Sequence, residues 1–308
     1  MALAPDRIDA VNHVLSGVAV FLMTEQTDGP MIAVMGCPDP DGLLAAKRLQ
    51  ESQVIGSAIL YESVDSTNTA ALAEIKSQCE HLGSLPRLLV ADRQVSGRGR
   101  HGRRWDSDGG TLTFTLVISN EDPEHREAMG RYCSLAVGVG ISRFLEYEFS
   151  PLKTSVKWPN DVYLAGGKLA GILLELDGRH PEYLVIGVGM NIGSVPELTD
   201  TNARQSATGL TQVIGRKVER YHLLDGLVES ILEAVDEISN DPIALVRELR
   251  DRCLLTGEKI EYQQDGSMYS GLCLGISEAG GLRIASTDGE IEITSGEAMR
   301  VRRHNDNP

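Results

Sequence analysis

The chain has 308 residues, of which 42% are hydrophobic and 24% are charged, and its formal net charge is −15 at pH 7. This length suits one large domain or two with a sizeable core, and the composition is that of a globular chain. The acidic balance argues against general nucleic-acid affinity, because binding to phosphates needs positive charge.

The cysteines and the apolar runs exclude further classes of protein. The chain has five widely spaced cysteines: Cys37, Cys79, Cys133, Cys253 and Cys273. This spacing predicts neither a zinc site nor a disulfide framework. Residues 14–23 form an apolar run that is too short to span a membrane, and the acidic residues Asp6 and Asp9 make it a poor signal peptide. We therefore expect a cytoplasmic protein with reduced thiols and no membrane partner.

Residues 1–40 are predicted to form an N-terminal extension of unclear role. The pattern suggests a short helix at 6–15, a short strand at 31–35 and a turn at 37–42. Arg7 is the only Lys or Arg in the extension. A recognition helix facing phosphates needs more positive charge than this, so we expect no DNA-binding domain.

The next predicted elements are a helix at 43–54 and a strand at 59–64. Asp65-Ser66-Thr67-Asn68 follows, and it precedes a helix predicted from 69 to about 81. Short polar side chains at a helix start can cap its orphan N–H groups. The same groups can also hold a neutral ligand that has its own donors and acceptors, so both interpretations stay open.

Residues 92–105, called the Gly/Arg loop below, connect a predicted strand at 88–91 with an alternating strand at 111–118. Within the loop, the stretch 97–104 contains four arginines: Arg98, Arg100, Arg103 and Arg104. Glycine lets backbone N–H groups approach a ligand closely, and arginine binds carboxylate or phosphate through paired donors. The loop therefore predicts an anionic ligand, with a solvated basic hairpin as the alternative.

The loop also matches the dinucleotide fingerprint through Gly97, Gly99 and Gly102. That fingerprint requires a helix directly after the glycines, because the helix N-terminus binds the pyrophosphate. The sequence predicts a strand after this loop, so we disfavour a Rossmann fold.

The central part of the chain is predicted to begin with a long helix at 124–149. Strands follow at 155–158 and 162–164, then a hairpin turn at Gly166-Gly167 and an apolar strand at 168–176 that we expect to be buried on both faces. Its first residue, Lys168, is either a solvated charge or a functional group. Asn160 and Asp161 between the first two strands are either turn formers or ligand-binding residues.

The remaining elements complete a fold of two parts. A strand at 183–191 contains Gly187 and Gly189, which leave room for a ligand or another backbone. A polar loop is expected at 202–209, followed by predicted helices at 212–214, 221–238 and 242–253. The four short runs after residue 255 are separated by Gly-containing turns and predict a small all-β unit.

Four blocks accompany the Gly/Arg loop and carry a resemblance to a known family: residues 65–69, 156–164, 166–175 and 185–192. In this order they resemble the catalytic domain of biotin protein ligases, over about residues 56–305. The combination of Gly-Arg-Gly-Arg with Lys-Trp-Pro-Asn-Asp at this separation is highly specific.

The resemblance implies the α+β fold of class II synthetase-like biotin/lipoate ligases. We expect a mixed, mostly antiparallel sheet with helices on one side in a catalytic domain at 41–254. A small SH3-like β-barrel is expected at 255–308.

The resemblance also implies the activity of a monofunctional biotin protein ligase. Such an enzyme uses ATP and Mg²⁺ to convert biotin to biotinyl-5′-AMP and transfers biotin to a lysine of a biotin carboxyl carrier protein. No redox cofactor and no nucleic acid are expected, and a homodimer is left open. The alternatives are a lipoate–protein ligase and a non-catalytic biotin-sensing regulator.

The resemblance assigns roles to individual residues. Arg100 and Lys168 are the expected catalytic residues, and Asp161 is a candidate magnesium ligand. The expected biotin-binding residues are Ser66, Thr67, Asn68, Gln94, Gly97, Arg98, Gly99, Arg100, Lys168, Gly187 and Gly189. The expected nucleotide-binding residues are Arg98, Arg100, Arg103, Trp105, Asn160, Asp161 and Asn191.

Overall fold

The structure, a computed structural model, describes residues 31–78, 82–193, 195, 207–264, 267–287, 289–294 and 298–300. The predicted helix at 6–15 and residues 202–206 of the predicted polar loop lie outside these ranges. Two compact units divide the chain. One comprises the described parts of Met1–Ser119, Leu174–Met190 and Glu219–Asp225, and the other those of Asn120–Leu173, Asn191–Val218 and Gly226–Pro308. None of the helices in the described ranges is both long enough and apolar enough to cross a bilayer.

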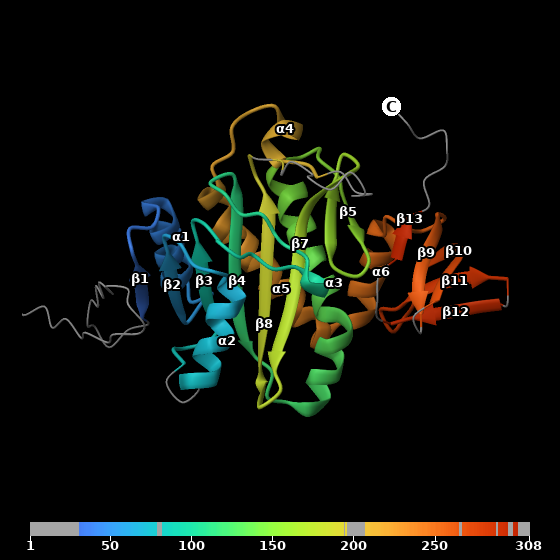
Figure 1. The fold of residues 1–308 in the computed structure, drawn as a ribbon, viewed down its shortest axis with the longest axis horizontal. Coiled ribbons are helices and arrows are strands. Elements are labelled where there is room, and N and C mark those ends of the chain that lie inside the picture. Colours follow the sequence, from blue (N-terminus) through green and yellow to red (C-terminus); the bar gives the residue numbers. More distant parts are fainter. Residues whose placement is uncertain are drawn as a thin grey trace, which may run out of the picture. The chain divides into compact units, whose positions relative to one another are not determined.

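Eight strands form the larger sheet, in the order β1-β2-β3-β4-β8-β7-β6-β5. The first four are β1 (Ile32–Met35), β2 (Ser57–Tyr61), β3 (Arg87–Ala91) and β4 (Thr111–Ser119). The pairs β1–β2 and β2–β3 are parallel and β3–β4 is antiparallel, as Figure 1 shows for this unit. Together with the antiparallel pairs β5–β6 and β6–β7, this confirms the predicted mixed sheet.

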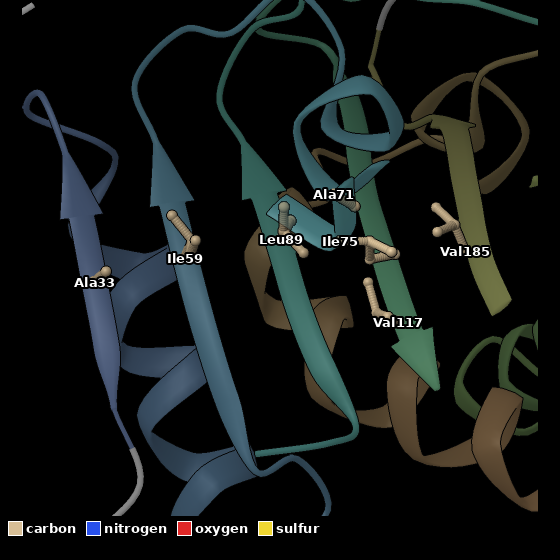
Figure 2. Packing of buried hydrophobic residues seen from close by; sticks show 7 residues of the cluster. All are labelled: Ala33, Ile59, Ala71, Ile75, Leu89, Val117 and Val185. Carbon is tan, nitrogen blue, oxygen red and sulfur yellow. The ribbon is translucent and has the colours of Figure 1, made fainter. Parts of the chain in front are cut away.

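Helix α2 (Thr67–Gln78) packs its apolar side against the first unit's part of the sheet. Its residues Ala71 and Ile75 are fully buried and point toward the strands (Figure 2). The cluster that they complete consists of Ala33, Ile59, Ala71, Ile75, Leu89, Val117 and Val185. Burying these side chains removes apolar surface from water and fixes the start of α2, where the polar block at 65–68 lies.

Helix α1 (Pro40–Glu51) lies on the opposite face of the same strands. Ile59 belongs to the cluster beneath α2, whereas the adjacent residue Leu60 approaches Gly42 of α1. Successive side chains of a strand point to opposite faces, so the two helices cover both faces here. The expectation of helices on one side was therefore wrong for this unit.

The start of α1 also corrects the predicted turn at 37–42. Asp39 accepts a hydrogen bond from the Asp41 N–H group, and Pro40 occupies the first helical position, so the segment begins a helix rather than only turning. The strand β1 pairs with β2 along its whole length. The predicted boundary after residue 40 therefore falls inside this sheet and helix layer.

The other unit contains a long helix and a β-meander. Helix α3 (Pro123–Glu148) is followed by β5 (Thr154–Lys157), β6 (Asp161–Leu164) and β7 (Gly167–Asp177), whose residues from Leu174 on belong to the first unit. The next strand, β8 (His180–Asn191), belongs to the first unit except for Asn191. The turn between β6 and β7 is formed by Ala165 and Gly166, which have φ angles of 48° and 82°. It lies one residue earlier than predicted, because Gly167 already opens β7.

Short helices follow, and a second sheet completes the chain. The helices are α4 (Leu210–Ile214), the 3₁₀ turn η3 (Arg220–Leu223), α5 (Leu224–Asn240) and α6 (Pro242–Arg252). The five strands are β9 (Lys259–Gln264), β10 (Ser267–Ile276), β11 (Leu282–Ser286), β12 (Gly289–Ile293) and β13 (Ala298–Arg300). They are antiparallel in the order β12-β11-β10-β9-β13, which confirms a small all-β unit; its closure into a barrel stays a prediction.

Candidate functional site

The Gly/Arg loop connects β3 with β4, as predicted, and folds back on itself. Arg98 and Arg104 form an antiparallel bridge, and the Trp105 N–H group donates to the Gly97 carbonyl at 2.9 Å. A Cβ atom at Gly97 would lie 2.4 Å from the Trp105 carbonyl oxygen. The close approach that glycine permits at Gly97 is therefore to the loop's own backbone.

The tip of the loop is a single 3₁₀ turn, η2 (Arg100–Gly102). His101 has a φ of 56° and Gly102 a φ of 71°, so the chain reverses here through left-handed conformations. A strand follows instead of a helix, which removes the structural context that a dinucleotide fingerprint needs. The Rossmann alternative is therefore excluded.

The start of the loop is anchored by Asp92. Its carboxylate accepts hydrogen bonds from the Asp39 N–H group at 2.8 Å, from Arg220 at 3.2 Å and from the Tyr221 hydroxyl. Burial, together with this bond to Asp92, raises the pKa of Tyr221 above its usual range. The end of β3 is thus fixed, so the loop begins from a rigid point.

The predicted biotin-binding block at the start of α2 is buried. Ser66, Thr67 and Asn68 each expose about 3% of their surface. The Gln94 side chain accepts hydrogen bonds from the Thr67 N–H group at 2.8 Å and from the Thr67 hydroxyl at 3.1 Å. An N–H group in the first turn of the helix is therefore satisfied by the Gly/Arg loop, and the loop and the block are held together.

Thr115 of β4 belongs to the same network, although the sequence analysis did not assign it. Its hydroxyl lies 2.7 Å from the Thr67 hydroxyl and 2.6 Å from Asn68 Oδ1. Thr111, Thr113 and Thr115 expose 1% or less of their surface. Alternation of polar and apolar residues usually marks a strand with one solvated face, but here the polar face lies against the site.

Glu175 of β7 is the second residue that was not assigned. Its Oε2 accepts hydrogen bonds from Asn68 Nδ2 and from Arg98 Nη2, both at 2.9 Å. The carboxylate thus joins the α2 block to Arg98 of the loop. Its partners lie 107 and 77 residues away in the sequence, so no local pattern reveals the contact.

The two glycines of β8 make room for side chains of this unit. A Cβ atom at Gly187 would lie 2.3 Å from Asn68 Oδ1, and one at Gly189 would lie 2.4 Å from the Trp105 ring. Any other residue would displace these groups. The predicted free space for a ligand is therefore filled by Asn68 and Trp105, and both glycines act through them.

The predicted residues of the other unit gather on the β6–β7 hairpin. Lys168 Nζ lies 2.7 Å from Asp161 Oδ1, and their side chains are 27% and 13% exposed. The Lys168 carbonyl accepts hydrogen bonds from the Thr208 N–H group at 2.9 Å and from Asn191 Nδ2 at 3.2 Å. The lysine therefore has a fixed backbone and a partly buried side chain, which does not fit a fully solvated charge.

Asn160 and Trp158 hold this hairpin in place. Asn160 Nδ2 donates to the Ile172 carbonyl at 2.8 Å, so its amide supports β7. The buried Trp158 donates from Nε1 to the Gly280 carbonyl at 3.0 Å. Burial, followed by the negative charge of Asp161, raises the pKa of the nearby Tyr163 above its usual range. The Lys-Trp-Pro-Asn-Asp block is therefore built into the unit as a rigid element.

The remaining arginines of the Gly/Arg loop differ in exposure. Arg103 and Arg104 are exposed, and Arg104 pairs with Asp106 at 3.1 Å, while Arg100 in η2 is half-buried. Across the described ranges, no three His, Cys, Asp or Glu side chains gather closely enough to hold a metal ion. Metal binding by Asp161 would compete with its ion pair to Lys168, so that assignment stays a prediction.

The site residues thus form two groups. Ser66, Thr67, Asn68, Gln94, Gly97, Arg98, Gly99, Arg100, Arg103, Trp105, Gly187 and Gly189 belong to one unit. Asn160, Asp161, Lys168 and Asn191 belong to the other. The first group combines neutral donors and acceptors with arginines, which suit a ligand with both polar and anionic parts. The second group places a lysine on a rigid hairpin. The mixed sheet with its helices gives the chain an α+β fold.

Comparisons with known proteins identify relatives of this α+β fold. Residues 60–191 match the family model described as the biotin/lipoate A/B protein ligase family, and this part of the chain is a domain of that family. The chain is 28% identical over 265 residues to the biotin–[acetyl-CoA-carboxylase] ligase of Mycobacterium tuberculosis, covering 83% of this chain and 96% of that one. It is 27% identical over 257 residues to the bifunctional ligase/repressor BirA of Bacillus subtilis, covering 80% and 75%.

A solved structure shows the same fold. The biotin protein ligase from Aquifex aeolicus, in complex with biotin and ATP, superposes with a TM-score of 0.66 and 29% sequence identity. The match covers 80% of this chain and 99% of that one. This similarity confirms the predicted α+β class, with a large mixed sheet and a small C-terminal antiparallel sheet.

Proposed function

We propose that this chain is an ATP-dependent biotin protein ligase. The observation that carries the proposal is the buried network of Thr67, Asn68, Gln94 and Thr115, which binds the arginine-rich Gly/Arg loop. The ureido ring of biotin is neutral and offers N–H donors and a carbonyl acceptor, which hydroxyl and amide groups match. The biotin carboxylate and the phosphates of ATP are anions, which arginines match.

The first step activates biotin. A carboxylate oxygen attacks the α-phosphorus of ATP, a new O–P bond forms, and the bond to pyrophosphate breaks, which gives biotinyl-5′-AMP. The two reactants carry like charges, so fixed cations must offset the charge before in-line attack. Arg100 and Lys168 are the groups that we assign to this task.

The second step transfers biotin to a protein. A lysine amine of a biotin carboxyl carrier protein attacks the acyl carbon, an amide bond forms and AMP leaves. The mixed anhydride is labile to water, so a loop that closes over it is useful. We assign this covering role to the Gly/Arg loop, and nucleotide contacts to Arg103, Trp105, Asn160, Asp161 and Asn191.

Magnesium is expected to enter with the triphosphate, since it is usually held by one or two carboxylates and by substrate phosphates. Asp161 is the candidate carboxylate. Its ion pair with Lys168 would have to be exchanged for the metal, so we assign no step to magnesium. The expected cytoplasmic location, a homodimer and the absence of a nucleic-acid partner also stay predictions.

The closest alternative is a lipoate–protein ligase, because the same family description includes both acids. The dithiolane ring of lipoate has no N–H group or carbonyl. It would gain no hydrogen bonds from the polar groups near Thr67 and Asn68, whereas the ureido ring of biotin would. Biotin is therefore the better substrate for this site, and a non-catalytic sensor would not need the lysine of β7.

The test combines the full chain, MgATP, a biotin carboxyl carrier domain and either biotin or lipoate. We expect the carrier to gain the mass of a biotinyl amide and to bind streptavidin, and we expect lipoate to give no product. Modification by lipoate at the same rate would support the alternative. Absence of any product with an active carrier control would contradict the proposal.

A lysine variant tests the catalytic assignment. Loss of a charge-assisted contact costs about 1.5–3 kcal/mol, so Lys168→Ala should slow adenylate formation by at least about tenfold. Lys153→Ala is the matched control, because Lys153 also pairs with a carboxylate, Glu146 at 3.2 Å, but is 81% exposed. Equal rates in the two variants would exclude a catalytic role for Lys168.

A further inference from the structure

Glu175 uses a single oxygen atom to hold two parts of the candidate biotin site. Oε2 lies 2.9 Å from Asn68 Nδ2 and 2.9 Å from Arg98 Nη2. The Glu175 side chain is 21% exposed and the Arg98 side chain 42% exposed, so this ion pair lies at the edge of the buried network. The carboxylate therefore couples the buried Asn68 to the accessible Gly/Arg loop.

The carboxylate also determines the orientation of the Asn68 amide. An ionised carboxylate can only accept hydrogen bonds, so the Asn68 NH₂ group must face Glu175. The amide oxygen then faces the Thr115 hydroxyl at 2.6 Å. Gly187 packs against this oxygen, so the amide has little room to move. A flipped amide would place two acceptors, the Asn68 oxygen and the Glu175 carboxylate, against each other.

The pairing changes the expected role of Arg98. The resemblance to biotin protein ligases assigned Arg98 to biotin and to the nucleotide. Its charge is offset by Glu175 in the structure, and its backbone forms the bridge to Arg104 that closes the loop. These contacts fit a residue that fixes the loop better than a residue that binds an anion.

We propose that Glu175 is a positioning residue of the ligase site that presents Asn68 in one orientation and, through Arg98, keeps the Gly/Arg loop closed over biotinyl-adenylate. This inference rests on the proposed function. Glu175 does not contact the reacting atoms; it acts through Asn68 on biotin binding and through Arg98 on adenylate retention. Arg98 then holds the loop in place, and Arg100 makes the loop's direct contacts with the anion.

The same strand provides a matched control. Asp177 lies two residues after Glu175, so both carboxylates project from the same face of β7. Asp177 also binds α2, through Lys76 at 3.4 Å, but among its described contacts are neither Asn68 nor the Gly/Arg loop. Asp177→Asn therefore removes a carboxylate between the same strand and helix without touching the site.

The experiment measures biotin KM and the dissociation rate of biotinyl-adenylate formed on the full chain. Glu175→Gln keeps an acceptor oxygen for Asn68 but removes the charge that pairs with Arg98. We expect adenylate to leave at least about fivefold faster, with biotin KM within about twofold of wild type. Glu175→Ala also removes the acceptor, so biotin KM should rise by about tenfold. Asp177→Asn should change neither quantity.

A double-variant cycle distinguishes two roles of Arg98: holding the loop through Glu175, and binding the adenylate directly. If Arg98 holds the loop, Arg98→Met should speed adenylate release as much as Glu175→Gln does, and the double variant should be no faster. If Arg98 binds the adenylate directly, Glu175→Gln should leave release unchanged or slow it, and this result would overturn the inference. A structural defect alone would lower the melting temperature without this pattern of non-additivity.

The outcomes also separate this inference from the proposed function. A wild-type chain that forms no adenylate from biotin and MgATP overturns both. A wild-type chain that forms and retains adenylate, combined with a Glu175→Gln variant that releases it at the wild-type rate, overturns only the role of Glu175. Glu175→Gln is nearly isosteric, so the test does not depend on whether Glu175→Ala folds.

Discussion

Two polar networks in this molecule use carboxylates and arginines in different ways. In the network around Asn68, one carboxylate oxygen of Glu175 accepts hydrogen bonds from the Asn68 amide and from Arg98. In the helical network around Arg143, the guanidinium group donates to both Glu237 and Glu248, with four hydrogen bonds of 2.6–3.0 Å. The first network mixes neutral and charged groups, whereas the second pairs opposite charges.

The pKa values of Arg143 and Glu248 show the strong charge pairing in the helical network. Hydrogen bonds to Glu237 and Glu248 raise the pKa of Arg143 above its usual range. Burial alone would raise the pKa of Glu248, but Arg143 and Arg252 outweigh it and hold that pKa below its usual value. Such saturated charge pairs stabilise helix packing and have few groups left for a ligand. We therefore expect changes in the helical network to affect stability, and changes around Asn68 to affect binding.

The largest effect is expected from Gly187→Ala, which should weaken biotin binding by disturbing the network around Asn68. The added Cβ would lie 2.3 Å from Asn68 Oδ1 and would displace the amide from Thr115 and Glu175. Biotin KM should rise by at least about fivefold, since a lost hydrogen bond to a buried group costs about 1–3 kcal/mol. Gly178→Ala is the control, because nothing lies within 4 Å of its Cβ position. An unchanged KM in Gly187→Ala would show that Asn68 does not contribute to biotin binding.

Arg143→Met is expected to lower stability and to leave activity unchanged. Methionine keeps the apolar stem but leaves Glu237 and Glu248 without this partner, which should lower the free energy of unfolding by about 1–2 kcal/mol. Carrier biotinylation well below the melting temperature should stay at the wild-type rate. Arg131→Met on the same helix removes only an exposed pair with Glu127, and it should leave stability unchanged. Equal stability of both variants would mean that the helical network is not a stabilising element.

A smaller and pH-dependent effect is expected from Glu146→Gln. Burial alone would raise the pKa of Glu146, but the Thr154 N–H group, Arg252 and Lys153 outweigh it and lower that pKa below its ordinary value of 4.5. A lowered folded-state pKa contributes stability above the unfolded value, and this contribution is lost as the pH falls through the folded value.

The measurement is the melting temperature of both proteins between pH 7 and pH 2. The variant should melt lower than the wild type at pH 7, the difference should shrink below about pH 4.5, and it should vanish once the wild-type carboxyl is protonated. A difference that stays constant over this range would show that hydrogen-bond geometry, and not charge, is responsible.

Local patterns predicted the elements that carry the site motifs. The strands on either side of the Gly/Arg loop, the long helix α3 and the β6–β7 hairpin lie where periodicity and turn residues place them. The start of α1 was missed because Pro40 and Asp39 are typical of turns as well as of helix N-termini. The strand β13 was missed because three residues are too few for a periodic signal.

The partners within the site could not be predicted in the same way. The threonines of β4 follow an alternating pattern that indicates solvent exposure, and only the packing of α2 shows that they are buried. Glu175 ends an apolar run, and its two contacts depend on which strands become neighbours in the sheet. Residue types revealed the chemistry of the site, but long-range pairing decided which groups meet.

The most direct test of the proposed activity is the exchange of labelled pyrophosphate into ATP by the full chain. The adenylation step is reversible, so label should enter ATP only when the acid substrate is present. We predict incorporation with biotin and MgATP, and none without biotin or when lipoate replaces it. Exchange that does not depend on biotin, or that lipoate supports equally well, would contradict the assignment of this chain as a biotin protein ligase.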